Sequence, residues 1–155
     1  MPSESPYHIE TSAYQIALPL PVTELEDAAR AVLASENVAA AELSLAVVDG
    51  EQMQAINKRH LDHDYDTDVL SFLLEASELS DGRSIEGEII VSVDMARKQS
   101  IEYQTDIRYE LVLYIVHGTL HLCGYDDLTA EDAAVMRQRE RELMDRPGMG
   151  DKRQG

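Results

Sequence analysis

Apolar residues along the chain follow two spacings, one typical of helices and one typical of buried strands. In the segment 25–33 they recur at steps of three and four residues, which places them on one face of a helix. Thr23 precedes this run and Glu26 follows three residues later, a pair typical of a helix N-cap. We therefore predict an amphipathic helix that Thr23 caps and that ends near Glu36.

Four shorter segments have the composition of strands. Residues 43–48, 69–74 and 88–93 are nearly continuous apolar runs, and a short alternation marks a further strand within 7–18. Only the turn-rich segment 75–84 separates 69–74 from 88–93. We therefore predict that these two strands form an antiparallel hairpin.

Four further helices are predicted from their apolar content and their end signals. They span about 50–60, 94–103, 105–124 and 129–146. Asp49, Thr105 and Thr129 are the predicted N-caps of the first, third and fourth of these helices, and Gly124 suits the end of the third. The predicted buried positions of the last helix are Val135, Met136, Leu143 and Met144.

The order of these elements, β-α-β-α-β-β-α-α-α, predicts the fold class. Strands and helices in this sequence favour an α+β fold with a mixed four-stranded sheet packed with about five helices. No linker or repeat divides the 155 residues, which are enough to bury one core. We expect a single small domain over 1–147, with 148–155 as a flexible polar tail.

Composition indicates a compartment and argues against one class of nucleic-acid-binding protein. The single cysteine, Cys123, allows no intramolecular disulfide and fits a reducing compartment. The first residues lack a secretory signal, and no apolar run approaches the ~20 residues of a membrane span. We therefore expect a cytoplasmic protein without membrane contact. The formal net charge of −17 argues against non-specific coating of nucleic acid, although it leaves room for a local site.

The segment 117–127 carries the candidate chemistry. His117 and His121 lie four residues apart in an apolar helix, so both imidazoles reach one point on the same face. Gly124 turns the chain after them, and Asp126 and Asp127 follow with carboxylates. Two histidines and a carboxylate are a ligand set that leaves one position of a zinc ion open for catalysis.

The residue after the first histidine weighs against a peptidase. In the zinc-protease pattern His-Glu-x-x-His, a glutamate at this place is the general base. This chain has Gly118 there. The sequence therefore keeps the metal-binding pattern but lacks the base of the protease.

Several segments together resemble the YbeY family of bacterial endoribonucleases. The run 117–126, HGTLHLCGYD, is similar to that family's signature, and 67–72, TDVLSF, resembles its second motif. Gly87-Glu88-Ile89 resembles a third element, and Asn57 matches the asparagine that usually ends the preceding helix. The likeness covers about residues 50–130 in the right order. It implies the α+β fold predicted above.

Two positions depart from the family pattern. Asp127 stands where the family usually has its third metal-binding histidine, and it keeps that histidine's spacing from His121. Asp126 matches an aspartate of the motif that orients a ligand, and it stays an alternative third ligand. The family's arginine is expected at Leu61; Arg59 is the predicted substitute for holding a phosphate, with His63 as the other candidate.

The resemblance implies a function, which we state as an expectation. The chain should be a zinc-dependent, single-strand-specific endoribonuclease with one Zn²⁺ held by His117, His121 and Asp127, and with Arg59, His117 and His121 as catalytic residues. It should act in late ribosome maturation, processing the 3′ end of small-subunit (16S) rRNA, and in ribosome quality control. Its partners would be single-stranded rRNA, the small ribosomal subunit and associated proteins. The alternatives are a zinc peptidase or other metallohydrolase, and a non-catalytic ribosome-associated factor with a structural metal.

Three residues near the motifs have a structural interpretation. We expect Cys123 to be a small core residue, Tyr125 to pack against the helix end, and Asp68 to cap the loop before its strand.

Overall fold

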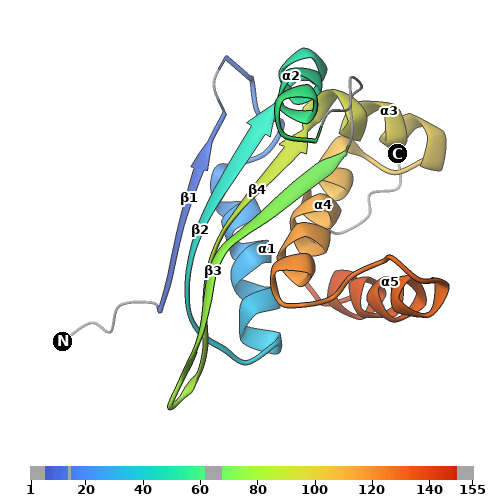
Figure 1. The fold of residues 1–155 in the computed structure, drawn as a ribbon. Helices are drawn as coiled ribbons and strands as arrows, with labels where there is room; N and C mark the ends of the chain where they lie inside the picture. Colours follow the sequence, from blue (N-terminus) through green and yellow to red (C-terminus); the bar gives the residue numbers. More distant parts are fainter. Residues whose placement is uncertain (1–5, 14, 62–67, 150–155) are drawn as a thin grey trace.

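The computed structural model describes residues 6–13, 15–61 and 68–149. Its elements in chain order are β1 (Tyr7–Ser12), α1 (Val22–Ser35), β2 (Val38–Val48), α2 (Gly50–Leu61), β3 (Val69–Leu79), β4 (Gly82–Ser92), α3 (Val93–Tyr103), α4 (Ile107–Leu122) and α5 (Ala130–Met144). This is the predicted order. The fold class is confirmed: one α+β domain with a four-stranded sheet and, among the described residues, five helices (Figure 1).

The sheet is mixed, as predicted. Its strands lie in the order β1-β2-β4-β3, with β1 parallel to β2, β2 parallel to β4, and β3 antiparallel to β4. The hairpin of β3 and β4 is much longer than predicted, because β3 continues to Leu79 and β4 already begins at Gly82, both within the segment 75–84. That segment is polar and mostly exposed, so it lacks the apolar pattern that marks a strand in the sequence.

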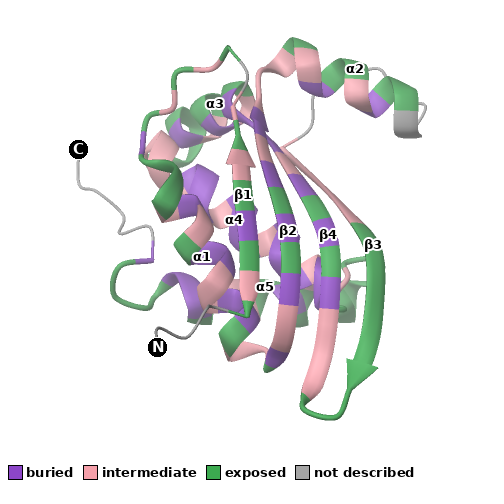
Figure 2. Cartoon of the chain, turned by 90° about the vertical axis from the view of Figure 1, so that its left-hand side faces the viewer, coloured by how far each residue is buried: buried purple, intermediate pink, exposed green. Residues whose placement is uncertain are grey.

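Helices cover one face of the sheet, and the core lies between them. In β2, alternate residues from Ala41 to Val47 are buried, while Glu42 and Ser44 between them are exposed. Figure 2 shows the strands in front with α1, α4 and α5 behind them. α4 is apolar around most of its circumference and packs against α1, α3, α5 and the sheet, which makes it the central helix of the domain.

The ends of the helices confirm some predicted caps and correct others. Asp49 accepts a hydrogen bond from the backbone N–H of Gln52 at 2.7 Å, and Thr129 accepts one from that of Asp132 at 3.0 Å, as predicted. The prediction for Thr23 is wrong, since this residue lies inside α1 and the cap position is Pro21. The proline ring holds φ of Pro21 near the value of a helix, and no side-chain hydrogen bond caps the first turn.

The prediction that Thr105 caps α4 is also wrong. Asp106 is the cap, and its carboxylate accepts the N–H of Tyr109 at 2.7 Å. The Thr105 hydroxyl instead donates to the buried carboxylate of Glu110 at 2.5 Å. Asp and Thr are both favourable caps, so the sequence alone did not separate two neighbours.

Burial along α5 agrees with the prediction except at one position. Met136, Leu143 and Met144 are buried, but Val135 is 58% exposed. Met149, in the predicted polar tail, is buried in the core cluster. No helix in the described part of the chain is both long enough and apolar enough to cross a membrane.

Candidate metal centre

α4 holds two histidines side by side on its C-terminal half. The side chains of His117 and His121 are each 26% exposed, on a helix whose other residues in this half are mostly buried. Their ring centroids lie 4.7 Å apart, with the ring planes at 79°. The spacing of four residues therefore places both imidazoles at one point, as predicted.

The chain reverses directly after α4 and brings a carboxylate to the histidines. Gly124 has a φ of +111°, and the N–H of Tyr125 closes the turn on the carbonyl of Leu120 at 3.1 Å. Oδ2 of Asp127 then lies 3.9 Å from Nε2 of His121. One ligand atom each from His117, His121 and Asp127 lie within 4.8 Å of one another. This spacing suits a single ion held by all three side chains.

Gly118 packs against the sheet rather than facing this cluster. A Cβ built at Gly118 would lie 2.7 Å from Cγ2 of the buried Ile89 on β4. A longer side chain at this position has no room while α4 lies this close to β4. The position that carries the general base in the protease pattern is therefore, in this chain, a packing contact between α4 and the sheet.

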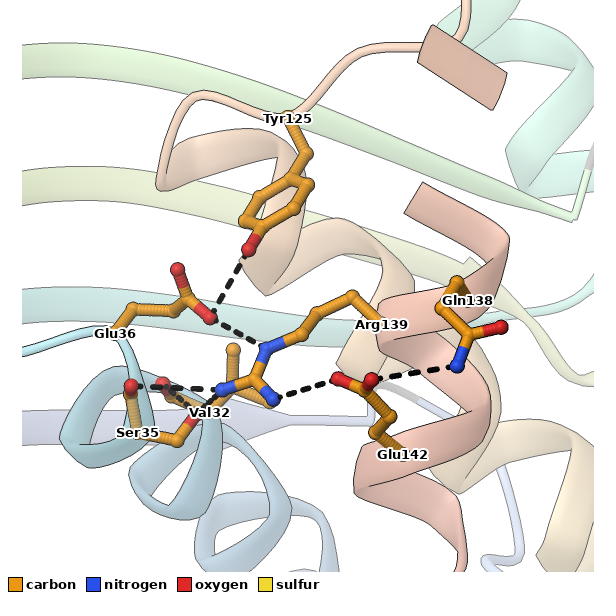
Figure 3. Close-up of polar contacts among 7 residues, drawn as sticks. All are labelled: Val32, Ser35, Glu36, Tyr125, Gln138, Arg139 and Glu142. Carbon is orange, nitrogen blue, oxygen red and sulfur yellow. Dashed lines mark hydrogen bonds and ion pairs between the residues drawn. The ribbon is translucent and has the colours of Figure 1, made fainter. Parts of the chain in front are cut away.

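A polar network anchors the loop that carries Asp127 (Figure 3). Glu36, which follows α1, accepts a hydrogen bond from the Tyr125 hydroxyl at 3.3 Å and one from Nε of Arg139 at 2.8 Å. Arg139 also donates to Ser35 Oγ at 3.0 Å and pairs with Glu142 at 3.0 Å. Because Arg139 lies on α5, this network joins α1, the loop after α4 and α5.

Glu140 on α5 supports the first histidine, and it is not among the residues predicted from the sequence. Its Oε2 lies 2.5 Å from Nδ1 of His117, and its side chain is only 16% exposed. A carboxylate at this nitrogen fixes it as the N–H donor and leaves Nε2 as the nitrogen available to a metal ion. Twenty-three residues separate the two side chains, and one glutamate in a helix rich in charged residues carries no local signal.

The charges around His117 change its affinity for protons. Burial lowers the pKa of His117, but the hydrogen bond and charge of Glu140, with the charges of Asp68 and Asp127, raise it more. The net result is a pKa above the ordinary value. The same negative charges favour a bound cation, so the electrostatics and the donor set both fit a divalent metal ion.

The structure separates the two candidates for the third ligand. A carboxylate oxygen of Asp127 lies within 4.8 Å of a ligand atom of each histidine, whereas the carboxylate of Asp126 accepts the N–H of Leu128 at 3.3 Å. The metal-binding role of Asp127 stays a prediction that this placement supports.

Of the two candidates for a phosphate-binding cation, Arg59 alone lies within the described residues. Arg59 is exposed in the last turn of α2, and no ion pair or hydrogen bond among the described residues joins it to the cluster. His63 lies outside the described residues, as does the side chain of Leu61.

The other residues near the motifs have structural roles. Asp68 accepts the N–H of Val69, the first residue of β3, at 2.7 Å; the loop that it is predicted to cap lies outside the described residues. Cys123 is buried in the core, where burial raises the pKa of its thiol to about 11. Tyr125 is part of the network of Figure 3, so it packs at the helix end as predicted.

Comparisons with known proteins agree with the motifs. The family model described as Endoribonuclease YbeY matches residues 9–148. A Bacillus licheniformis protein with this name is 40% identical over 136 residues, which are 83% of this chain and 86% of the relative. One from Salinibacter ruber is 41% identical over 113 residues, 70% of this chain and 72% of the relative. A Thermotoga maritima protein solved in solution has a TM-score of 0.56 and 20% identity over 89% of each chain, which supports the fold alone.

Proposed function

This chain belongs to the YbeY family of endoribonucleases, and we propose that it is a metal-dependent endoribonuclease acting on single-stranded RNA in ribosomal RNA processing. The finer activity we propose is late ribosome maturation, with processing of the 3′ end of 16S rRNA, and ribosome quality control. Its partners would then be the small ribosomal subunit and associated proteins in the cytoplasm. The observation that carries the proposal is the cluster of His117, His121 and Asp127.

We propose one zinc ion per chain, held by these three side chains. When bound, zinc acts as a Lewis acid on a phosphoryl oxygen and lowers the pKa of water. Asp127 adds a negative charge that a third imidazole would not, so the ion should be a weaker Lewis acid here than with three histidines. The side chain of Asp127 is 49% exposed, which leaves this side of the cluster open to a substrate.

The protein residues hold this site in place. Glu140 orients the imidazole of His117 through Nδ1, which leaves Nε2 as the nitrogen that would bind the ion. The network of Figure 3 anchors the loop that carries Asp127. Arg59 stays the proposed cation for the reacting phosphate, since the end of α2 adjoins the family's second motif in the sequence.

Two alternatives are less well supported. A peptidase would need a general base near the first histidine, and Gly118 faces Ile89 in the core. A structural metal would need a fourth protein ligand. Among the described residues the cluster has three members, while Cys123 is buried in the core and Asp126 caps a turn.

The test is to strip the protein of metal with a chelator, restore zinc, and follow cleavage of a labelled single-stranded RNA. We expect cleavage to stop on stripping, to return with zinc, and to be absent in His117→Ala. A duplex RNA and unfolded casein serve as substrate controls. Cleavage that continues at the same rate in the stripped protein would refute the metal mechanism, and casein hydrolysis without RNA cleavage would favour the peptidase.

A further inference from the structure

A cavity of about 670 Å³ lies directly beside the cluster. Helices α3, α4 and α5 all contribute to its wall, and His117 belongs both to this wall and to the metal cluster. Figure 1 shows α3 and α5 toward opposite ends of α4. This volume is in the range of pockets that hold a small ligand, roughly 300–1,000 Å³. A group of the substrate bound in this cavity would therefore lie next to an ion held by His117.

Arg137 is the only lysine or arginine among the described residues that line the cavity. Its side chain is exposed on α5, and no carboxylate of the described residues lies within ion-pair distance of it. The acids of the same wall already accept hydrogen bonds: Glu140 with His117, Glu110 from Thr105, and Asp68 from the N–H of Val69. In a chain with 30 acidic and 13 basic residues, an arginine without a carboxylate partner beside a metal cluster is suited to an external anion.

α3 contributes an aromatic ring and an amide to the cavity wall. Tyr103 ends α3, and 62% of this large aromatic residue is exposed. Gln99 lies one turn earlier on the same helix face, and its carbonyl oxygen accepts the hydroxyl hydrogen of the buried Tyr114. This bond orients the amide and leaves its NH₂ group as a donor. A ring beside a fixed amide donor is how proteins bind an unpaired base.

We propose that this cavity is the subsite for one nucleotide of single-stranded RNA next to the cleaved phosphate. Arg137 holds a neighbouring phosphate, Tyr103 stacks on the base, and the amide of Gln99 donates to the edge of the base. The inference rests on the proposed function and adds the position of the RNA strand on the protein. A paired base cannot enter such a site without leaving its stack, so the subsite also gives a reason for single-strand specificity.

The test compares variants of the full chain after restoring zinc. The variants are Arg137→Ala, Arg137→Lys, Tyr103→Ala and Tyr103→Phe, with Arg30→Ala as the control. Arg30 carries the same charge on α1, pairs with Asp27 at 2.8 Å, and does not line the cavity. Kd for a fluorescein-labelled single-stranded RNA is measured by anisotropy on metal-stripped protein at several salt concentrations. KM and kcat are measured with zinc, and the metal content of each variant is checked.

Arg137→Ala should raise Kd and KM, keep its metal, and reduce the slope of log Kd against log salt by about 0.7, the loss of one phosphate contact. Arg137→Lys should keep the slope of the unaltered protein. Tyr103→Ala should weaken binding roughly 5- to 150-fold, and Tyr103→Phe should not, because stacking needs only the ring.

Two results would overturn the subsite. If Arg137→Ala and Arg30→Ala change Kd and the salt slope equally, the effect is one of overall charge and the subsite is wrong, while RNA cleavage still stands. If the unaltered zinc-restored protein neither binds nor cleaves RNA, the proposed function fails and the subsite fails with it.

Discussion

Replacing Glu140 with glutamine tests how the site holds its metal. The change keeps the size of the side chain and an oxygen that can accept the N–H of His117, but it removes the charge 2.5 Å from the ring. Partners of a metal-binding histidine typically contribute about 10- to 100-fold in metal affinity. Since both side chains are less than one third exposed, water screens this pair only partly. We therefore expect Glu140→Gln to weaken zinc binding by about 10-fold or more, or roughly 1.4 kcal/mol.

The assay is competition for zinc between the protein and a chelator of known affinity. Glu142→Gln is the matched control, because it makes the same chemical change two residues away, where the carboxylate pairs with Arg139 and not with His117. Urea unfolding of the metal-free proteins separates lost affinity from lost fold. If Glu140→Gln binds zinc as tightly as the unaltered protein while His117→Ala loses it, Glu140 does not support the ligand.

Three further predictions concern the cluster and its surroundings. Asp127→Ala should lose zinc and Asp127→His should keep it, as measured by metal analysis; full retention by the alanine variant would refute the ligand assignment. Gly118→Ala should destabilise the protein by about 1–3 kcal/mol in urea, because its Cβ would meet Ile89 at 2.7 Å, and an unchanged midpoint would contradict this packing. In the metal-free protein the pKa of His117 lies above its ordinary 6.5. Protonated His117 therefore stabilises the folded state fully below pH 6.5, and this stabilisation is lost as the pH rises through the pKa of His117 in the folded protein. Glu140→Gln should lower that pKa, measured by NMR titration, and should reduce the pH dependence of unfolding.

Local pattern predicted most of the fold. The apolar spacing of 25–33 and the buried runs of β2 and β4 set the elements and their order, because burial of one face leaves a period in the sequence. The outer half of the β3–β4 hairpin left no such period. It is held by backbone pairing of the exposed end of β3 with a partly buried stretch of β4, so composition alone predicts a turn there.

The residues of the site, too, could be predicted from the sequence only where they are close along the chain. His117, His121 and Asp127 are close in sequence, so helix geometry and one turn at Gly124 were enough to predict that they meet. Glu140 reaches them only through the packing of α5 on α4, which no local pattern records.

The position of α5 has a consequence for how the protein opens. Arg139 ties this helix to the loop of Asp127 through Glu36, and its neighbour Glu140 ties it to His117. An ion that joins His117 to Asp127 would therefore close a ring of contacts through α4, the loop and α5. Loss of the ion should free these segments to unfold locally before the sheet does, and their amide hydrogens should exchange faster while those of β2 and β4 stay protected.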